Sequence, residues 1–457
     1  MAEQPVIIQK ISWSDLCPWT IIFKTLPIAA SVSVLAFALL GVVLMPMGWL
    51  LSESIFVTQD MRDNPNFMNI VEVNRSPYRA VFLERQTQTD SIKILGAPLS
   101  GPRMVFQQFV KPFAYLFDSN WGLGECWYFF VGCAWTILVW SFIGIAITRI
   151  CLLRLTRNEQ SGLDDAFEFA LDKWLTAAGA VGIPLLAVGA ICVPAFIIGL
   201  FMSFDVGVVL VSLIWFVVLA LAGMIGLLLL GLMFGWPLMI ASVGCESQNS
   251  FDAMTRAYAY TYQKPINYLF YCLIAILFGG FCWLIVGTLT ENVVDLSYWS
   301  TSWGTNVVSA DRTDIIRGEI AIPVDEGLAE PADAAVGDAA KDTTDPNALT
   351  ALKAGQGIIG LWEAMFKTLA AAFIYGLFWC MTSAVYLLLR KDVDETEMDE
   401  ISVVDEKRTY ELPPLKSDEN GIPQVQTPTP VSQSNDCLLY TSPSPRDATL
   451  YRMPSSA

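Results

Sequence analysis

"VGVVLVSLIWFVVLALAGMIGLLLLGLMFGWPLMIASV", Val206 to Val243, contains no Asp, Glu, Lys, Arg or His. A helix needs about 20 consecutive apolar residues to cross the hydrocarbon core of a bilayer. This run is longer than that, so it predicts a membrane-spanning helix that projects past the bilayer toward Glu246.

The rest of the chain has the same composition. It has 457 residues, of which 54% are hydrophobic and 16% charged, whereas soluble domains carry about a quarter charged residues. Six blocks are long and apolar enough to span: Leu26–Leu51, Cys126–Ile147, Thr176–Ser203, Val206–Val243, Ile266–Leu289 and Leu369–Leu389. Membrane-spanning strands would show short alternating segments instead. The sequence therefore predicts an all-α, polytopic transmembrane helical bundle with six spans.

Basic residues in the short connections predict the orientation of these spans. They fall on one side if both termini share that side: Lys10, Lys24, Arg149, Arg154, Arg157, Arg256, Lys264, Arg390 and Lys391. By the positive-inside rule this side is cytoplasmic. The first block has no small-residue cleavage site after it, so we interpret it as a span and not as a signal peptide. We expect a multi-pass protein of the bacterial inner membrane with both termini in the cytoplasm.

The predicted domain boundaries follow the spans. We expect an inner N-terminal segment (1–25), a five-span core (26–289) with an outer loop (52–125), an acidic flexible outer loop (290–356), the sixth span (357–391), an acidic inner tail (392–436) and a final segment (437–457). The final segment contains "CLLYTSPSPRD", Cys437 to Asp447, whose back-translation resembles a transposase sequencing adapter. We therefore expect 437–457 to be an adapter-derived scar.

The first outer loop has two recognisable patterns. Alternation around Val71 and Val81 is typical of a strand, and Met104, Phe109 and Phe117 belong to an amphipathic segment. We expect this segment to lie on the outer membrane surface, and the alternative is that the loop forms a small ordered cap.

Three short amphipathic helices are predicted on the inner side, at Ser12–Trp19, Ser161–Trp174 and Phe251–Pro265. Ser161 with Asp164 has the spacing of a capping box, and Asn249 is a good cap for the third helix. Each helix leads into an odd-numbered span. The spans are therefore predicted to form three hairpins, each introduced by an inner interfacial helix.

The third interfacial helix, "FDAMTRAYAYTYQKP", supplies most of the candidate contact residues. The candidate lipid-headgroup or interface contacts are Arg256, Tyr258, Tyr260, Tyr262, Lys264 and, from the second helix, Trp174. Tyr and Trp favour the headgroup layer, and basic side chains there meet anionic phosphates. An alternative is acid-base chemistry by Glu246, Asp252, Arg256 and Tyr258, but the sequence does not fix their geometry. We favour anchoring.

Other chemistry finds little support in the sequence. The chain has no histidine, and its ten cysteines include no C-x-x-C pair, so neither a zinc site nor a Ser-His-Asp nucleophile is indicated. No nucleotide-binding fingerprint is present. We predict no cofactor, no metal, no nucleic-acid partner and no enzymatic activity.

A family resemblance rests on the residues around the third interfacial helix. Glu246, Ala253, Arg256, Ala257, Tyr260 and Lys264 form the pattern, with "FGWPLMIA" at Phe234–Ala241 and "SAVYLLLRKDVDETEMDE" at Ser383–Glu400. The stretch 12–400 resembles uncharacterised bacterial six-span proteins of the glycerophosphodiester phosphodiesterase membrane-domain type. The resemblance implies a six-span fold and no defined reaction, because the metal carboxylates and histidines of the phosphodiesterase domain are absent.

The functional expectation is a non-enzymatic membrane scaffold or assembly protein that contacts the lipid bilayer, with a possible protein partner at the acidic inner tail. The alternative is a transporter or permease for a neutral solute or lipid. Three prolines and four glycines could kink the third and fourth spans for such a path: Pro184, Pro194, Pro237, Gly179, Gly182, Gly189 and Gly199. We interpret the glycines as sites of close helix packing instead. Glu363 and Lys367, one turn apart, predict an ordinary helical ion pair.

Overall fold

A computed structural model describes residues 17–76, 90–117, 121–159, 162–246, 248–305, 316–317 and 346–396, with backbone alone at 90–100 and 346–349. The chain divides into two compact units, Met1–Ser402 and Val403–Ala457. All of the second unit lies outside the described residues. The predicted scar and most of the predicted inner tail therefore also lie outside them.

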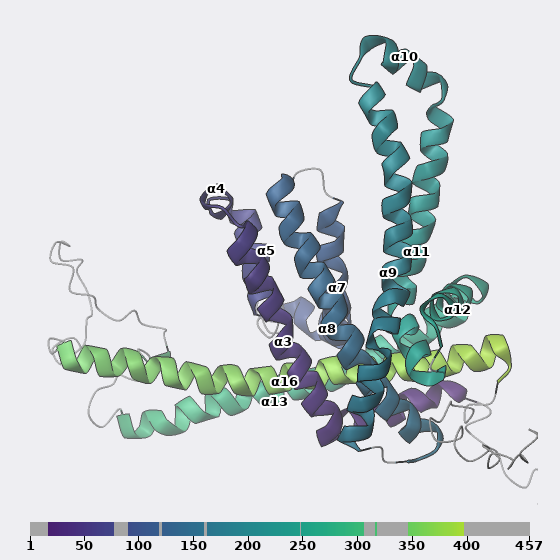
Figure 1. Ribbon diagram of the computed structural model, residues 1–457. Coiled ribbons are helices and arrows are strands. Elements are labelled where there is room, and N and C mark those ends of the chain that lie inside the picture. Colours follow the sequence, from purple (N-terminus) through teal and green to yellow (C-terminus); the bar gives the residue numbers. More distant parts are fainter. Residues whose placement is uncertain are drawn as a thin grey trace, which may run out of the picture. The chain divides into compact units, whose positions relative to one another are not determined.

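Every regular element in the described ranges is a helix (Figure 1). In chain order the elements are η1 (Pro18–Lys24), α2 (Thr25–Ala29), α3 (Val32–Phe56), α4 (Gln59–Arg62), α5 (Pro65–Arg75), α7 (Asp90–Leu116), α8 (Leu123–Thr156), α9 (Leu163–Phe201), α10 (Asp205–Leu213), α11 (Trp215–Glu246), α12 (Ser250–Gln263), α13 (Pro265–Thr305) and α16 (Pro346–Asp394). The predicted all-α fold class is confirmed. Six of these helices, α3, α8, α9, α11, α13 and α16, are long and apolar enough to cross a membrane, which indicates a multi-pass membrane protein.

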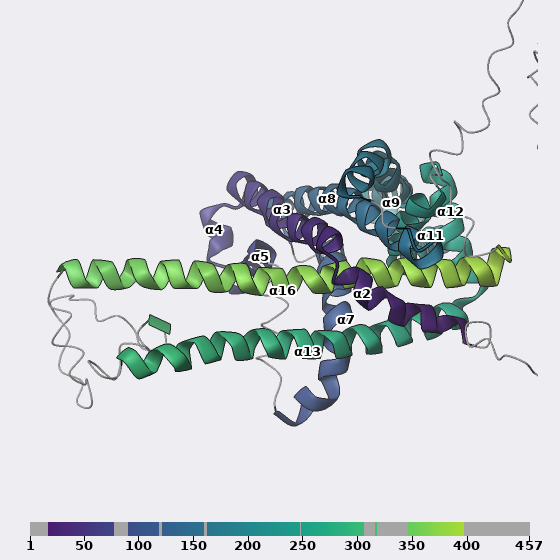
Figure 2. The same ribbon diagram turned by 90° about the horizontal axis from the view of Figure 1, so that it is seen from below.

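The six long helices pair as three hairpins. Helix α3 packs on α8, α9 packs on α11, and α13 packs on α16. In Figure 1 the first two hairpins project the same way and α13 and α16 run across them, and Figure 2 shows α13 and α16 side by side. The three predicted hairpins are therefore present, with the third crossing the other two.

The helices differ sharply in how much of their apolar surface the protein covers. In the apolar 18-residue stretch of α16, 94% is buried inside the protein. The corresponding shares are 17% in α9 and 11% in α11. Mean hydropathy does not explain the difference, because it is higher in α9 and α11 (2.5 and 2.7) than in α16 (1.8). Helix α16 is the central element, while the α9–α11 hairpin faces outward.

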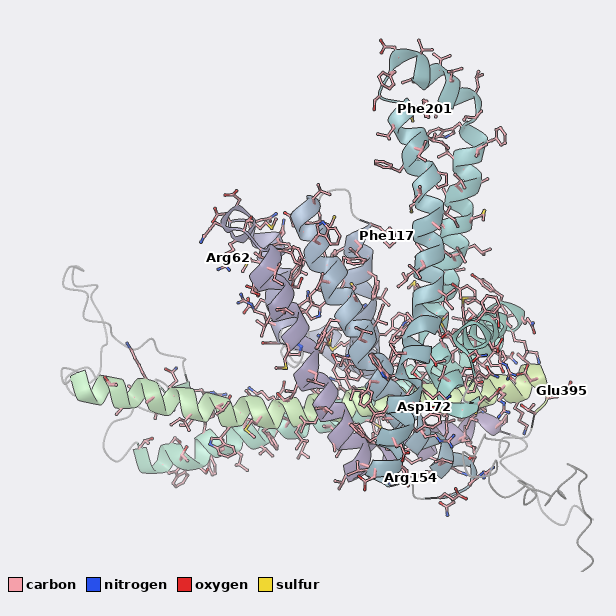
Figure 3. The ribbon with its side chains drawn as sticks, viewed as in Figure 1. Arg62, Phe117, Arg154, Asp172, Phe201 and Glu395 are labelled. Carbon is pink, nitrogen blue, oxygen red and sulfur yellow. The ribbon has the colours of Figure 1, made fainter. Side chains whose placement is uncertain are left out.

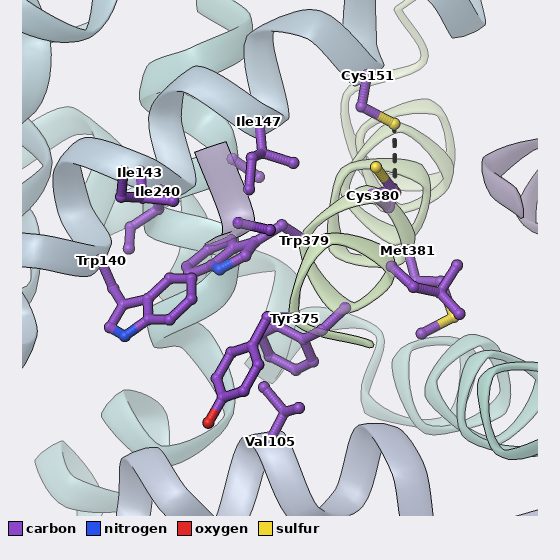
Figure 4. Packing of buried hydrophobic residues seen from close by; sticks show 14 of the residues in the cluster. Val105, Trp140, Ile143, Ile147, Cys151, Ile240, Tyr375, Trp379, Cys380 and Met381 are labelled. Carbon is purple, nitrogen blue, oxygen red and sulfur yellow. Dashed lines mark hydrogen bonds between the residues drawn. The ribbon is translucent and has the colours of Figure 1, made fainter. Parts of the chain in front are cut away.

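Aromatic rings fill the core where α7, α8, α11 and α16 meet. Trp140 stacks on Tyr375 with ring centroids 4.9 Å apart, and Phe109 meets Trp140 edge-on at 5.3 Å. Trp379 lies beside the Trp140 ring, 6.3 Å away (Figure 4). Close by, the thiol of Cys151 donates to the carbonyl of Cys380 at 3.5 Å. These cysteines pack as small buried side chains.

The predicted position of the first outer loop's amphipathic segment is wrong. Its residues do form a helix, α7, but Met104, Val105 and Phe109 are buried in the bundle core. Helix α7 packs on α13, α8 and α16. Its apolar stripe faces other helices of the protein and not the membrane surface. Amphipathic periodicity shows that a helix has an apolar stripe, but it does not show what that stripe contacts.

The predicted strand around Val71 is also wrong. Val71 lies in α5, where it is fully buried, and Val81 lies outside the described residues. The side-chain oxygen of Asn64 caps α5 by accepting from the backbone N–H of Asn66 at 3.1 Å, and Pro65 occupies the first turn. Cap and proline start a helix here, and they outweigh the short alternation.

Three predicted boundaries change. Ser31 has an extended backbone, so α2 is separated from α3. Ile214 interrupts the long apolar run, so α10 forms a separate helix at the turn between α9 and α11 (Figure 1). The end of this run is as predicted, since α11 continues to Glu246. The predicted outer loop 290–356 is shorter, because α13 continues to Thr305 and α16 begins at Pro346.

The three predicted interfacial helices agree with the structure to different extents. The second is no separate helix, because it is the first part of α9, with Gly162 at the cap and its N–H bonded to the Asp165 carboxylate at 3.2 Å. Ser161, the predicted cap, lies outside the described residues. The third is the separate helix α12, with Asn249 at the N-cap position as predicted, although the Asn249 side chain makes no capping hydrogen bond. The first falls largely outside the described ranges, which show η1 from Pro18.

Candidate functional site: a charged cluster joining α11, α12 and α16

Glu246, the last residue of α11, forms ion pairs with arginines from two other helices. Nε of Arg390 in α16 lies 2.9 Å from one carboxylate oxygen, and Nη1 of Arg256 in α12 lies 2.5 Å from the other. The side chains of Glu246 and Arg390 are 12% and 8% exposed. The hydroxyl of Tyr386 donates to the same carboxylate at 3.3 Å, as does the side-chain amide of Gln248. Glu246 is thus the centre of a largely buried network.

Asp394 extends this network at the end of α16. It accepts a hydrogen bond from the Tyr260 hydroxyl and lies 3.7 Å from Nη1 of Arg256. Burial raises the pKa of Tyr260, and the bond to the Asp394 carboxylate raises it further, so this hydroxyl stays a donor. We call the following residues the Glu246 cluster: Glu246, Arg256, Tyr260, Tyr386, Arg390 and Asp394.

Small side chains position α12 against its neighbours. Ala253 and Ala257 are fully buried, and Ala257 lies within 3.7 Å of the position that a Cβ on Gly235 of α11 would occupy. Because alanine lets backbones approach closely, Arg256 reaches Glu246 across a short gap. Glu246, Arg256 and Tyr260, three of the residues that carry the family resemblance, therefore belong to one cluster here.

Two of the predicted tyrosines bond to the backbone of α11. The hydroxyl of Tyr258 donates to the carbonyl of Leu228 at 2.8 Å, and that of Tyr262 donates to Leu227 at 2.6 Å. The Tyr258 ring occupies the space beside Gly231, where an added Cβ would lie 2.2 Å from a ring carbon. Burial raises the pKa of Tyr258 to about 12. These tyrosines fix α12 along α11.

Lys264 lies at a second polar contact, between the start of α13 and the end of α16. Its ammonium group donates to the backbone carbonyl of Asp392. The Asp392 carboxylate accepts from the amide of Asn267 at 3.0 Å and from the hydroxyl of Tyr271 at 2.9 Å. Asp392, the first residue of the predicted acidic inner tail, is held by these contacts.

Arg149 of α8 lies beside the Glu246 cluster. Its Nη1 donates to the carbonyl of Gly244 at 3.3 Å, and its guanidinium stands 4.6 Å above the Phe169 ring. The residue is 5% exposed. A cation over an aromatic face is attracted by the ring quadrupole, so Arg149 connects α8 and α9 to the end of α11.

The six residues predicted to contact lipid headgroups or the membrane interface have different surroundings. Five of them make protein contacts on or near α12, and Trp174 is half-buried on α9. The Arg256 side chain and Tyr262 are each 39% exposed, which leaves part of their surface accessible. Lipid-headgroup contact stays a prediction.

This geometry does not bring together all four residues of the acid-base alternative. Glu246 is held between two arginines, and Asp252 is exposed, outside the cluster. Across the described ranges, no group of three or more His, Cys, Asp or Glu could hold a metal ion. The arrangement joins helix ends and offers no unpaired carboxylate beside the cluster's tyrosines.

Sequence reasoning missed Arg149, Tyr386 and Asp394 as parts of this site. Arg149 and Arg390 entered the sequence analysis solely as markers of orientation. A usable signal did exist, because Glu246 and Arg390 each follow directly on a long apolar run. Charges at the ends of packed helices tend to pair with one another.

A second feature is an apolar cavity of about 200 Å³ between α7, α8, α9 and α11. Phe109, Trp140, Leu185 and Trp236 contribute to its wall, one from each helix. No Asp, Glu, Lys or Arg lines it. It is separate from the Glu246 cluster, with which it shares no residue.

Comparison with known proteins adds no assignment, because no family model, no curated protein and no solved structure matches this chain. The resemblance to six-span membrane-domain proteins therefore stays a prediction.

Proposed function

We propose that this protein is a non-enzymatic assembly protein of the bacterial inner membrane, with the α12 end on the cytoplasmic side. The observation that carries the proposal is the outward exposure of the α9–α11 hairpin. Phe196 and Leu200 of α9 are 68% and 52% exposed, and Phe216 of α11 is 70% exposed. Apolar surface of this extent needs lipid or a membrane partner to cover it.

The glycines of the hairpin support a role in contacts with other molecules. Within the described part of the chain, the predicted close helix packing is not made at Gly182, Gly189 and Gly199, since no atom other than their own helix backbone lies within 4 Å of a Cβ added there. Of the four glycines considered, Gly179 alone has a close neighbour, Ser250. Glycines on an open face allow a helix from another protein to approach closely.

The Glu246 cluster supports the non-enzymatic part of the proposal. Its charged groups pair with one another and join the ends of α11, α12 and α16. This clamp holds the base of the α9–α11 hairpin against the buried α16, so the hairpin is presented from a fixed support.

Site-specific photo-cross-linking in native membranes tests the proposal. A photoreactive phenylalanine analogue at Phe196 is expected to capture a protein partner in stoichiometric yield. The same analogue at Trp379, which is fully buried, serves as the control and captures residues of this chain alone. Labelling of lipid alone at Phe196, Leu200 and Phe216 would refute the assembly role.

A deletion can also test whether the acidic tail binds the partner. It should start after Thr396, because Asp392 and Asp394 belong to the folded contacts described above. Co-purification of the partner is expected to fall if the tail binds it, whereas retained co-purification assigns binding to the hairpin.

Transport of a neutral lipid is a second candidate, and the apolar cavity favours it. Flux in proteoliposomes would be expected to fall when Leu185, in the cavity wall, is replaced by tryptophan. Bulky residues at Gly182 or Gly189 are a poor test, because open space surrounds both positions.

A further inference from the structure

The first part of α9 carries two neighbouring rows of exposed side chains. The apolar row repeats every four residues and consists of Leu163, Phe167, Leu171 and Leu175. Its members are between 43% and 62% exposed. The acidic row has the same spacing and consists of Asp164, Glu168 and Asp172, which are all exposed. Residues four apart lie on one face of a helix, so an apolar ridge runs beside a carboxylate ridge.

The described part of the protein leaves both ridges uncovered. Helix α9 packs on α8, α11 and α12, and it does so through another face, on which Ala166, Phe169 and Ala170 are buried. Phe167 meets the Phe142 ring of α8 edge-on at 5.5 Å but is still 44% exposed. The apolar ridge therefore lacks the protein cover that the opposite face of the same turns has.

The hydrocarbon core of the membrane does not cover these turns either. The stretch Trp174–Phe201 contains no Asp, Glu, Lys or Arg. At ~1.5 Å per residue it is longer than the ~30 Å core that it has to cross. Every charged residue of α9 comes before Trp174, and charged side chains are costly in hydrocarbon. The two ridges therefore lie outside the core, where acyl chains do not reach them.

The charge of these turns selects what can cover the apolar ridge. Residues 163–174 carry four carboxylates and one ammonium group, a net charge of −3. That ammonium group, on Lys173, already pairs with Asp172 at 3.0 Å. Anionic lipid headgroups would be repelled here, since they attract basic segments. An amphipathic helix binds through apolar residues at helical spacing, and Lys or Arg beside them would meet the carboxylate ridge.

We propose that the first part of α9 is a docking surface for a basic amphipathic helix of a cytoplasmic protein partner. Leucine-like side chains of the partner pack on the ridge from Leu163 to Leu175, and its Lys or Arg side chains pair with Asp164, Glu168 and Asp172. The inference rests on the cytoplasmic location of the α12 end in the proposed function. It assigns a partner chemistry to a surface separate from the acidic tail and from Phe196.

Binding of a defined peptide to the full chain in phosphatidylcholine nanodiscs tests this surface. The probe is a fluorescently labelled helical peptide of leucine and lysine, with leucine on one face, and binding is measured by fluorescence anisotropy. The matched control peptide has glutamate in place of lysine. Nanodiscs leave both membrane faces accessible, and empty nanodiscs give the baseline. The basic peptide is expected to bind above this baseline, and the acidic peptide is not.

Charge substitutions locate the binding on the carboxylate ridge. Asp164→Asn, Glu168→Gln and Asp172→Asn together should weaken binding on the order of tenfold, as loss of three exposed ion pairs implies. Asp165 is kept, because its carboxylate accepts a hydrogen bond from the Gly162 N–H at 3.2 Å. The control removes three exposed carboxylates elsewhere and should leave binding unchanged: Asp60→Asn, Asp63→Asn and Asp205→Asn.

Two further arms test the apolar ridge and the charge separately. Leu171→Gln is expected to weaken binding on the order of tenfold, because the leucine is no longer available for burial. Raising NaCl to about 1 M shortens the Debye length to ~3 Å and should also weaken binding. The salt arm uses the unaltered chain, so misfolding of a variant cannot imitate its result.

Several results would overturn the proposal: equal binding of the two peptides, equal weakening in the two triple variants, or no effect of Leu171→Gln. A photoreactive phenylalanine analogue at Phe167 in native membranes supplies another check. Labelling of lipid there assigns the ridge to the membrane surface, and labelling of this chain alone assigns it to another segment of the chain, both against the proposal. Labelling of lipid alone at Phe196 would refute the hairpin contact and leave peptide binding intact, so the two failures are distinguishable.

Discussion

Glu246 is the residue on which the joining of α11, α12 and α16 depends most. Glu246→Gln removes the charge that faces Arg256 and Arg390, and Arg390 is nearly buried. Removing one partner of a buried ion pair costs about 3 to 5 kcal/mol. We expect a loss of that order in the free energy of unfolding, measured by denaturant titration in detergent.

The matched control for this change is Glu363→Gln. Glu363 pairs with Lys367 at 3.4 Å along α16, as the sequence predicts, with side chains 24% and 29% exposed. A pair of this kind contributes about 0.2–0.5 kcal/mol. Equal effects of the two substitutions would show that the Glu246 cluster does not hold the helices together.

Tyr258 gives α12 a dependence on pH. Burial raises its pKa to about 12, above the usual value of 10.0. Its contribution to stability is complete below pH 10 and is lost as the pH rises through 12, because the unfolded chain releases the proton first. The melting temperature should fall across this window, and Tyr258→Phe should reduce the fall. An unchanged pH profile in the variant would contradict this role.

At the scale of elements, the docking of α12 on α11 depends on Gly231. Gly231→Ala would place a Cβ 2.2 Å from the Tyr258 ring, and overpacking of this kind costs about 1–3 kcal/mol. Gly226→Ala on the same helix is the control, because its Cβ would meet no atom within 4 Å. We expect the first to lower the melting temperature and the second to leave it unchanged or raise it. Equal effects would argue against this docking.

The sequence predicted elements well where one physical signal dominates. Long uncharged runs identified the helices that cross the bundle, and Pro265 marked the start of α13. Helix α7 was misplaced, because an apolar stripe with Met104 and Phe109 fits a membrane surface and a protein core equally well. Helix α7 faces the protein core because it packs on α13, α8 and α16. The periodicity of the α7 sequence carries no information about these neighbouring helices.

At the scale of the whole molecule, burial cannot be deduced from hydropathy. Helix α16 is the least apolar of the six long helices and the most buried, while α9 and α11 show the reverse. The candidate site is subject to the same limit. Both ends of the Glu246–Arg390 pair are evident in the sequence, but their meeting depends on how distant helices pack. Lipid is an equivalent environment for an apolar side chain, so composition cannot distinguish bilayer from protein.

The final prediction concerns how the chain crosses the membrane. Arg154 lies at the end of α8, and Phe201 lies at the far end of α9 (Figure 3). Helix α9, at about 1.5 Å per residue, is longer than the ~30 Å hydrocarbon core. Reporter insertions after Arg157 and at Gln248 should therefore report one side, and an insertion at Ser203 the other. The positive-inside rule makes the shared side cytoplasmic. Opposite sides for Arg157 and Gln248 would show that α9 and α11 do not cross as a hairpin.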